Sequence, residues 1–129
     1  MASTSKTCVK SDKTPAAIGP YSIAVKANGF VFTSGQVGID PRTNELAVGG
    51  LEAETHQVFA NLKLVLDAAG TDLSKVVKVT VFLKNMGDFA AMNAIYAQYF
   101  TGDFPARSAF QVAALPKGAL IEIEAVAEQ

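Results

Sequence analysis

Arg107 is the side chain of this sequence best placed to bind an anion. It follows Phe104-Pro105-Ala106 at the start of an apolar segment typical of a strand, so the rigid proline and the strand hold its position. A planar guanidinium with several N–H donors suits a carboxylate or a phosphate. An arginine that pairs with a neighbouring acid, or that caps a loop, would give the same pattern.

Glu122 and Glu124 alternate with isoleucines in the last predicted strand. Because side chains alternate between the two faces of a strand, both carboxylates lie opposite Ile121 and Ile123. If their face is packed, burial raises the pKa of at least one glutamate, as a general acid or base near neutral pH requires. An ordinary solvent-facing alternation would look the same. The alternation would also allow the Glu122 carboxylate to lie near Arg107.

Two other segments place polar groups among apolar ones. Asn93 lies within the apolar run 90–96, where its amide needs a ligand or a backbone carbonyl as a partner. Ser34-Gly35 falls near the end of a predicted strand, where backbone N–H groups can be offered to an anion or a carbonyl. A plain bulge or turn explains Ser34-Gly35 equally well.

The remaining reactive side chains lack supporting neighbours. His56 has no cysteine or acid at ligand spacing, and we expect a surface or first-turn histidine. Cys8 has no basic neighbour at motif spacing, so a catalytic thiolate is not expected. One Cys and one His leave no metal framework, and nucleotide, flavin and pyridoxal motifs are absent from the sequence. We therefore expect no metal and no cofactor.

Composition predicts an ordinary globular protein of one domain. The chain has 129 residues, of which 50% are apolar and 18% charged, with a formal net charge of -1. That charge excludes a strongly basic nucleic-acid arm and a polybasic membrane patch. The sequence has no long apolar run, so we expect no membrane span and no signal-peptide core.

Residues 1–13 form a polar, Ser/Thr-rich lead, and residues 14–129 are expected to form the single domain. We expect an irregular lead with an edge strand around residues 7–10. A mitochondrial transit peptide is the alternative, although the lead has no arginine and no apolar helical stripe. A single cysteine cannot form an intramolecular disulfide, which favours a reducing compartment, most simply the cytosol.

Hydrophobic periodicity predicts the elements that position these residues. Asn28-Gly29 between two β-branched and aromatic runs predicts a hairpin, and residues 40–50 are typical of a loop. Apolar residues at three- and four-residue steps predict a helix over 52–69, stopped by glycine, and a second helix that runs to about residue 100. Asn85 or Asp88 caps the second helix. The strands are expected over residues 22–27, 30–37, 76–83, 107–114 and 120–127.

This order of elements predicts an α+β fold of two layers. Two helices cannot cover both faces of a sheet this wide, so we expect them on one face of a mixed sheet. The strands that contain Phe30 and Val76 are apolar on both alternations, so the other face needs a cover. A second copy of the chain is the economical cover, which predicts a homo-oligomer.

Several short motifs occur in order between about residue 14 and residue 127. They are Ala16-Ala17-Ile18-Gly19-Pro20-Tyr21-Ser22, Thr33-Ser34-Gly35-Gln36, Val79-Thr80-Val81-Phe82-Leu83, Asp88-Phe89 with Met92-Asn93, Phe104-Pro105-Ala106-Arg107-Ser108, Leu115-Pro116 and Ile121-Glu122-Ile123-Glu124-Ala125. In this order and at this spacing they resemble the Rid family, the reactive intermediate deaminases formerly called the YjgF group, and within it the RidA type.

The resemblance implies a chorismate-mutase-like fold and a homotrimer with clefts between subunits. It implies metal-free hydrolysis of 2-iminobutanoate and 2-iminopropanoate, or their enamine tautomers, to 2-oxo acids and ammonia. Many RidA-type members have a cysteine where this chain has Ala109, which leaves no thiol for a redox role there. The implied site residues are Arg107 and Glu122 for catalysis, and Tyr21, Ser34, Gly35, Asn93, Arg107 and Ala109 for substrate binding.

The residue types suit this chemistry. Arg107 can hold the carboxylate of a 2-imino acid bidentately, and Glu122 can take a proton from water and return it to the leaving nitrogen. Asn93 and the Ser34-Gly35 amides can orient substrate or water, and Tyr21 offers a wall and a hydroxyl. Imines hydrolyse readily once they are oriented.

Two other functions fit parts of the sequence. A cleft with an arginine could bind 2-oxo acids or other small carboxylates without turnover, as a regulatory module. Nuclease and translation-inhibitor activity is ascribed to some eukaryotic relatives. A net charge of -1, one histidine and no Lys/Arg stripe argue against RNA as a main partner, and we expect neither a nucleic-acid nor a membrane partner.

Overall fold

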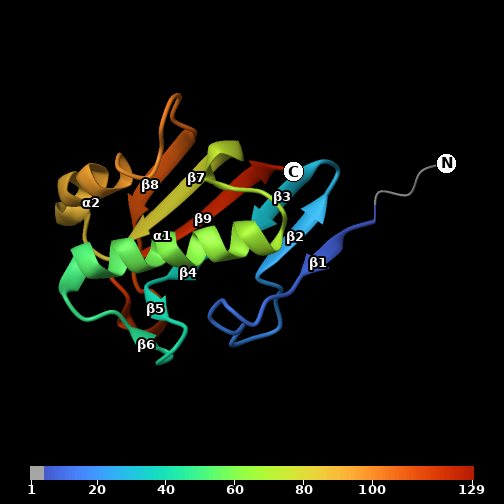
Figure 1. Cartoon of the computed structure of the whole chain (residues 1–129). Helices are drawn as coiled ribbons and strands as arrows, with labels where there is room; N and C mark the ends of the chain where they lie inside the picture. Colours follow the sequence, from blue (N-terminus) through green and yellow to red (C-terminus); the bar gives the residue numbers. More distant parts are fainter. Residues whose placement is uncertain (1–4) are drawn as a thin grey trace.

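One mixed sheet organises the chain, with strand order β1-β2-β3-β9-β7-β8 and with β4 also paired to β9. The computed structural model describes residues 5–129 (Figure 1). The pairs are antiparallel except for β7 and β8, which are parallel and are joined through α2. The strands of this sheet are β1 (Thr7–Val9), β2 (Ala24–Ala27), β3 (Phe30–Thr33), β4 (Gln36–Val37), β7 (Val76–Leu83), β8 (Ala106–Gln111) and β9 (Ile121–Glu128).

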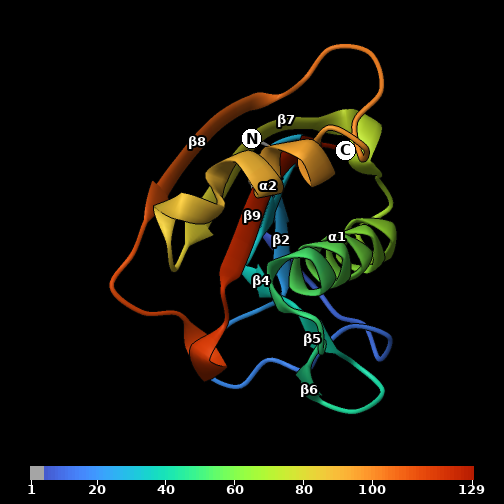
Figure 2. The same cartoon turned by 90° about the vertical axis from the view of Figure 1, so that its left-hand side faces the viewer.

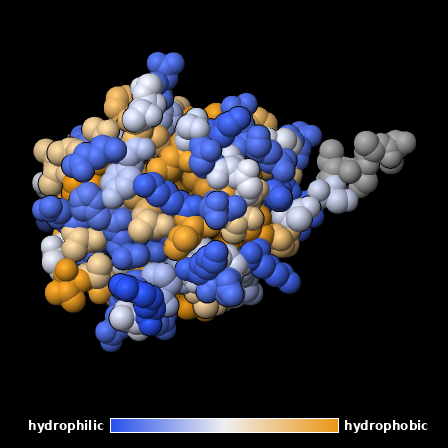
Figure 3. Space-filling model, viewed as in Figure 1, coloured by the Kyte–Doolittle hydropathy of each residue, from blue (hydrophilic) through white to orange (hydrophobic). Residues whose placement is uncertain are grey.

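Both helices lie on the same side of the sheet, as the sequence predicted (Figures 1 and 2). α1 (Gly50–Ala68) and α2 (Phe89–Tyr96) close the core over β7 and β9. On this helix-covered side, hydrophilic and hydrophobic residues are intermixed at the surface (Figure 3). The opposite face of the sheet, called the open face below, is not covered by any helix in residues 5–129.

The open face carries large apolar side chains. Phe32 of β3 and Phe110 of β8 are 46% and 44% exposed. Phe110 packs edge-on against Phe82 of β7, with ring centroids 5.2 Å apart. Exposed apolar area of this kind is usually covered in the functional form of a protein.

The predicted turns and helix stops have their expected geometry. Asn28 and Gly29 have φ angles of 54° and 85°, the left-handed values that a two-residue hairpin turn requires. Gly70 has a φ of 82° and ends α1, with its N–H donated to Asp67 O and the Thr71 N–H donated to the carbonyl of residue 66. Of the two candidate caps before α2, the Asn85 side chain accepts a hydrogen bond, from Gly87 N–H.

Four element predictions were wrong in detail. The strand expected over 107–114 is β8, which ends at Gln111. The strand expected over 30–37 divides into β3 and β4. Residues 40–50, expected as a loop, contain all but the first residue of a small hairpin of β5 (Ile39–Asp40) and β6 (Glu45–Leu46). α2 stops at Tyr96 and not near residue 100, because the N–H groups of residues 98 and 99 turn to carbonyls three residues back. In the described part of the chain, no helix is long and apolar enough to cross a bilayer.

Candidate functional site

The break between β3 and β4 falls at Ser34-Gly35. The Ser34 N–H is donated to Ile23 O at 2.9 Å and its hydroxyl to Ser22 O, so Ser34 is satisfied within the protomer. The Gly35 N–H donates to none of the described residues. Of the two amides predicted to meet a ligand, only that of Gly35 is therefore available.

Glu122 of β9 lies directly against this break. A Cβ atom on Gly35 would sit 1.9 Å from the Glu122 Oε2, so any larger residue there would displace this carboxylate. Burial raises the pKa of Glu122, and repulsion from the Glu124 carboxylate raises it further. The expectation of a partly desolvated carboxylate is thus confirmed. A carboxyl group that holds its proton more tightly than usual, beside a free amide, suits proton transfer.

A cleft of about 540 Å³ opens over Glu122 and Gly35. Tyr21 lines it with a half-exposed ring, and its hydroxyl accepts a hydrogen bond of 3.4 Å from Ile18 N–H. The structure therefore brings together Tyr21, Ser34, Gly35 and Glu122. The full lining is Pro15, Ala16, Ile18, Tyr21, Ile23, Thr33, Ser34, Gly35, Gln36, Val37, Ile39, Asn44, Pro116, Glu122 and Glu124.

Arg107 lies on the other face of the sheet. Its neighbour on β8, Ser108, accepts a hydrogen bond of 3.0 Å from Lys78 on the open face. By strand alternation Arg107 points to the helix-covered side, where its guanidinium lies over the ring of Tyr96, 4.7 Å from the centroid. Glu122 is opposite Ile121 and Ile123 and so belongs to the open face. Within one protomer the structure does not bring Arg107 and Glu122 together.

Asn93 and Ala109 lie on the same side of the sheet as Arg107. Asn93 lies one turn after Phe89 and one turn before Tyr96 on α2, the two residues whose rings contact Arg107. Its half-buried side chain has no hydrogen-bond partner among the described residues. Ala109 is two residues after Arg107 on β8 and packs against the core. Neither residue lines the cleft over Glu122.

Two buried polar residues of α1 hold the site segments and were missed from the sequence. Asn61 Nδ2 donates to Val37 O at 3.1 Å and to Ile39 O at 2.8 Å, beside the break at Gly35. Glu54 accepts from Leu120 N–H at 2.8 Å, just before β9. Their positions on the apolar stripe of the predicted helix were the available signal, because a polar residue there must find a partner.

The larger hollow of the protomer is not the predicted site. It measures about 750 Å³ and lies between the C-terminal part of α1 and residues 99–103, with none of the predicted site residues in its lining.

His56 of α1 contacts the Tyr99 hydroxyl through Nδ1, and Cys8 is exposed on β1. Among residues 5–129, no group of three or more His, Cys, Asp or Glu side chains is arranged to hold a metal ion.

Comparisons with known proteins match nearly the whole chain. The family model described as endoribonuclease L-PSP covers residues 11–129. The mouse 2-iminobutanoate/2-iminopropanoate deaminase is 50% identical over 129 residues, 100% of this chain and 96% of that protein. A RutC family protein of Pyrococcus horikoshii is 51% identical over 95% of this chain and 97% of its own length. The crystal structure of YyfA from Yersinia pestis, of the conserved Rid family, superposes with a TM-score of 0.94 at 46% identity, covering 97% of this chain and 100% of that one.

Replacing Asn61 by alanine is expected to lower the free energy of unfolding by about 2–3 kcal/mol, because two buried carbonyls lose their donor. Urea denaturation measures this change. Gln98→Ala is the control, since its exposed amide donates one long bond of 3.4 Å, and it is expected to be nearly neutral. Equal stability of Asn61→Ala and the wild type would show that these carbonyls do not depend on Asn61.

Proposed function

The chain belongs to the endoribonuclease L-PSP family, and we propose that it hydrolyses 2-iminobutanoate and 2-iminopropanoate to 2-oxo acids and ammonia. Relatives from mouse and human, about 50% identical over the whole of this chain, are named for this activity. The observation that carries the proposal is the Glu122 carboxyl, with its raised pKa, lying against the free amide of Gly35 in a cleft. Turnover of 2-iminobutanoate, generated in situ by threonine dehydratase, tests it directly.

Imine hydrolysis requires a group that first accepts a proton and later donates it. Glu122 takes a proton from water as the water oxygen bonds to the imine carbon, and the C=N electron pair moves to nitrogen. Glu122 returns this proton to that nitrogen, which gives a carbinolamine. It then takes the proton of the carbinolamine hydroxyl and passes it to the nitrogen as the C–N bond breaks, so that the C=O forms and ammonia leaves. The Gly35 N–H is placed to donate to the oxygen that bonds to carbon. A raised pKa suits both halves of this cycle.

Arg107 and Glu122 act together when they come from neighbouring protomers. They lie on opposite faces of the sheet in one chain, and the exposed aromatic rings of the open face need a cover. A homotrimer places Arg107 and Asn93 of one subunit over the cleft of the next. Arg107 then holds the substrate carboxylate, while Tyr21, Gly35 and Glu122 of the neighbour face the imine.

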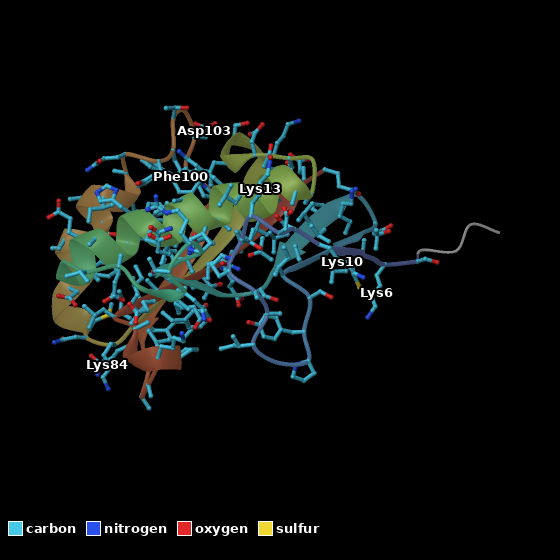
Figure 4. All side chains as sticks on the ribbon, turned by 60° about the horizontal axis from the view of Figure 1, so that its bottom comes forward. Lys6, Lys10, Lys13, Lys84, Phe100 and Asp103 are labelled. Carbon is cyan, nitrogen blue, oxygen red and sulfur yellow. The ribbon has the colours of Figure 1, made fainter. Side chains whose placement is uncertain are left out.

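RNA cleavage fits the molecule less well. The net charge is -1, and the lysines labelled in Figure 4 are dispersed, with Lys6 and Lys10 near the N-terminus and Lys84 at the other end of the molecule.

A binding module without turnover would use the same arginine but would not need the Glu122 carboxylate. The cytosol is the compartment we propose, from the single cysteine, and cell fractionation tests it.

Glu122→Gln is expected to abolish most turnover while 2-oxobutanoate still binds, because the amide keeps the shape but accepts no proton. Arg107→Lys is expected to lose binding as well, since a point charge does not replace the bidentate fork. Steady-state turnover and calorimetric binding separate the two effects, with His56→Ala as an active control. An active Glu122→Gln enzyme would contradict the assigned role of the carboxylate.

Glu124→Gln is expected to move the acid limb of the kcat/KM profile to lower pH. The Glu124 charge raises the pKa of Glu122, so its removal lowers that pKa and leaves Glu122 deprotonated at lower pH. Glu128→Gln, on the same strand but at its far end, is the control and should leave the limb in place. An unmoved limb in Glu124→Gln would mean that another group controls it.

Mixing two inactive variants is expected to restore activity. Arg107→Ala and Glu122→Gln subunits, refolded together at equal amounts, give mixed trimers in which one cleft has both intact residues. Random assembly would return about a quarter of the wild-type activity. Light scattering should give three times the 13.5 kDa chain mass. A trimer without complementation would place both residues in one protomer's site, and a stable monomer would exclude the shared cleft.

A further inference from the structure

The guanidinium of Arg107 is held by aromatic rings and not by an acid. No carboxylate of the described residues lies within ion-pairing distance of it. Its Cζ lies 4.7 Å from the ring centroid of Tyr96 and 5.5 Å from that of Phe89, and one terminal nitrogen is 4.0 Å from Met92 Sδ. An acidic partner would occupy the N–H fork. Contacts to ring faces leave that fork free.

Tyr96 is the better fixed of the two rings. It is only 4% exposed and ends α2. Phe59 packs edge-on against it with centroids 5.9 Å apart, and Phe100 packs against it at 4.8 Å. Phe104 stacks on it at 6.5 Å. A ring enclosed in this way presents a fixed face to the guanidinium.

The hydroxyl of Tyr96 does not explain why this residue lies beneath the arginine. Its oxygen is buried without a hydrogen-bond partner among the described residues. Burial raises the pKa of Tyr96, so the group stays neutral at physiological pH. The contact with Arg107 is made by the ring, whose face carries the negative end of its quadrupole.

We propose that Tyr96 is a positioning residue whose ring face fixes the plane of the Arg107 guanidinium, so that its N–H fork is preset for a substrate carboxylate. The inference rests on the proposed function for the carboxylate itself. A preset fork lowers the conformational cost of binding, so the loss of the ring should act on affinity more than on the chemical step.

Three variants at position 96 test the ring. Tyr96→Leu is expected to weaken 2-oxobutanoate binding about tenfold, and to raise KM for 2-iminobutanoate by about as much with a smaller change in kcat. Tyr96→Phe is expected to keep wild-type affinity. Replacing Tyr96 by pentafluorophenylalanine keeps the shape of the ring but inverts its quadrupole, and is expected to weaken binding as leucine does.

Phe100→Leu is the matched control, because Phe100 packs against Tyr96, whereas the rings that contact the Arg107 guanidinium are those of Tyr96 and Phe89. It should lower the melting temperature without weakening binding. If Phe100→Leu weakens binding as much as Tyr96→Leu, or if the fluorinated ring binds normally, Tyr96 has only a structural role and the proposal is overturned.

A readout without substrate separates this proposal from the proposed function. The Arg107 Nε–H resonance of the ligand-free protein should shift in Tyr96→Leu and in the fluorinated variant, and not in Phe100→Leu. If the wild type neither hydrolyses imines nor binds 2-oxobutanoate, the proposed function is wrong. The Arg107 Nε–H resonance then still tests whether Tyr96 positions the guanidinium. An unmoved resonance in both Tyr96 variants overturns the positioning itself.

Discussion

The two-residue alternation of side chains along β9 is the constraint from which the site follows. Every second residue, from Ile121 to Ala127, is buried beneath the helices, so the residues between them must face the other way. A register slip of one residue would exchange the two sets, at the cost of the core. The apolar core therefore fixes where the Glu122 carboxylate points.

The same rule separates Arg107 from Glu122. β8 runs parallel to β7 and continues its alternation, with Ser108 and Phe110 on the open face and Arg107 towards α2. Each half of the site has its own environment. The carboxylate sits where burial and a neighbouring charge favour its protonated form, and the guanidinium lies over aromatic faces without an acidic partner among the described residues. In the trimer that we propose, assembly brings these two halves together.

Local precision at the cleft comes from polar groups inside the apolar layer. Asn61 and Glu54 reach from α1 to the backbone at residues 37–39, which line the cleft, and at Leu120, which precedes β9. Buried side-chain hydrogen bonds of this kind are directional, whereas apolar packing is not. Between these segments Gly35 lies so close to Glu122 that a Cβ atom there would meet the carboxylate.

The sequence by itself determined the element types, the hairpin at Asn28-Gly29, the single helical layer and the face on which Glu122 lies. These features follow from periodicity and local turn chemistry, which depend on residues close together in the chain. Only the tertiary structure decided the break at Ser34-Gly35, the end of α2 at Tyr96 and the separation of Arg107 from Glu122. Each of these depends on which segments far apart in the chain become neighbours. The alternation within one strand shows which of its side chains share a face, but it does not show which residues of another strand lie on that same face.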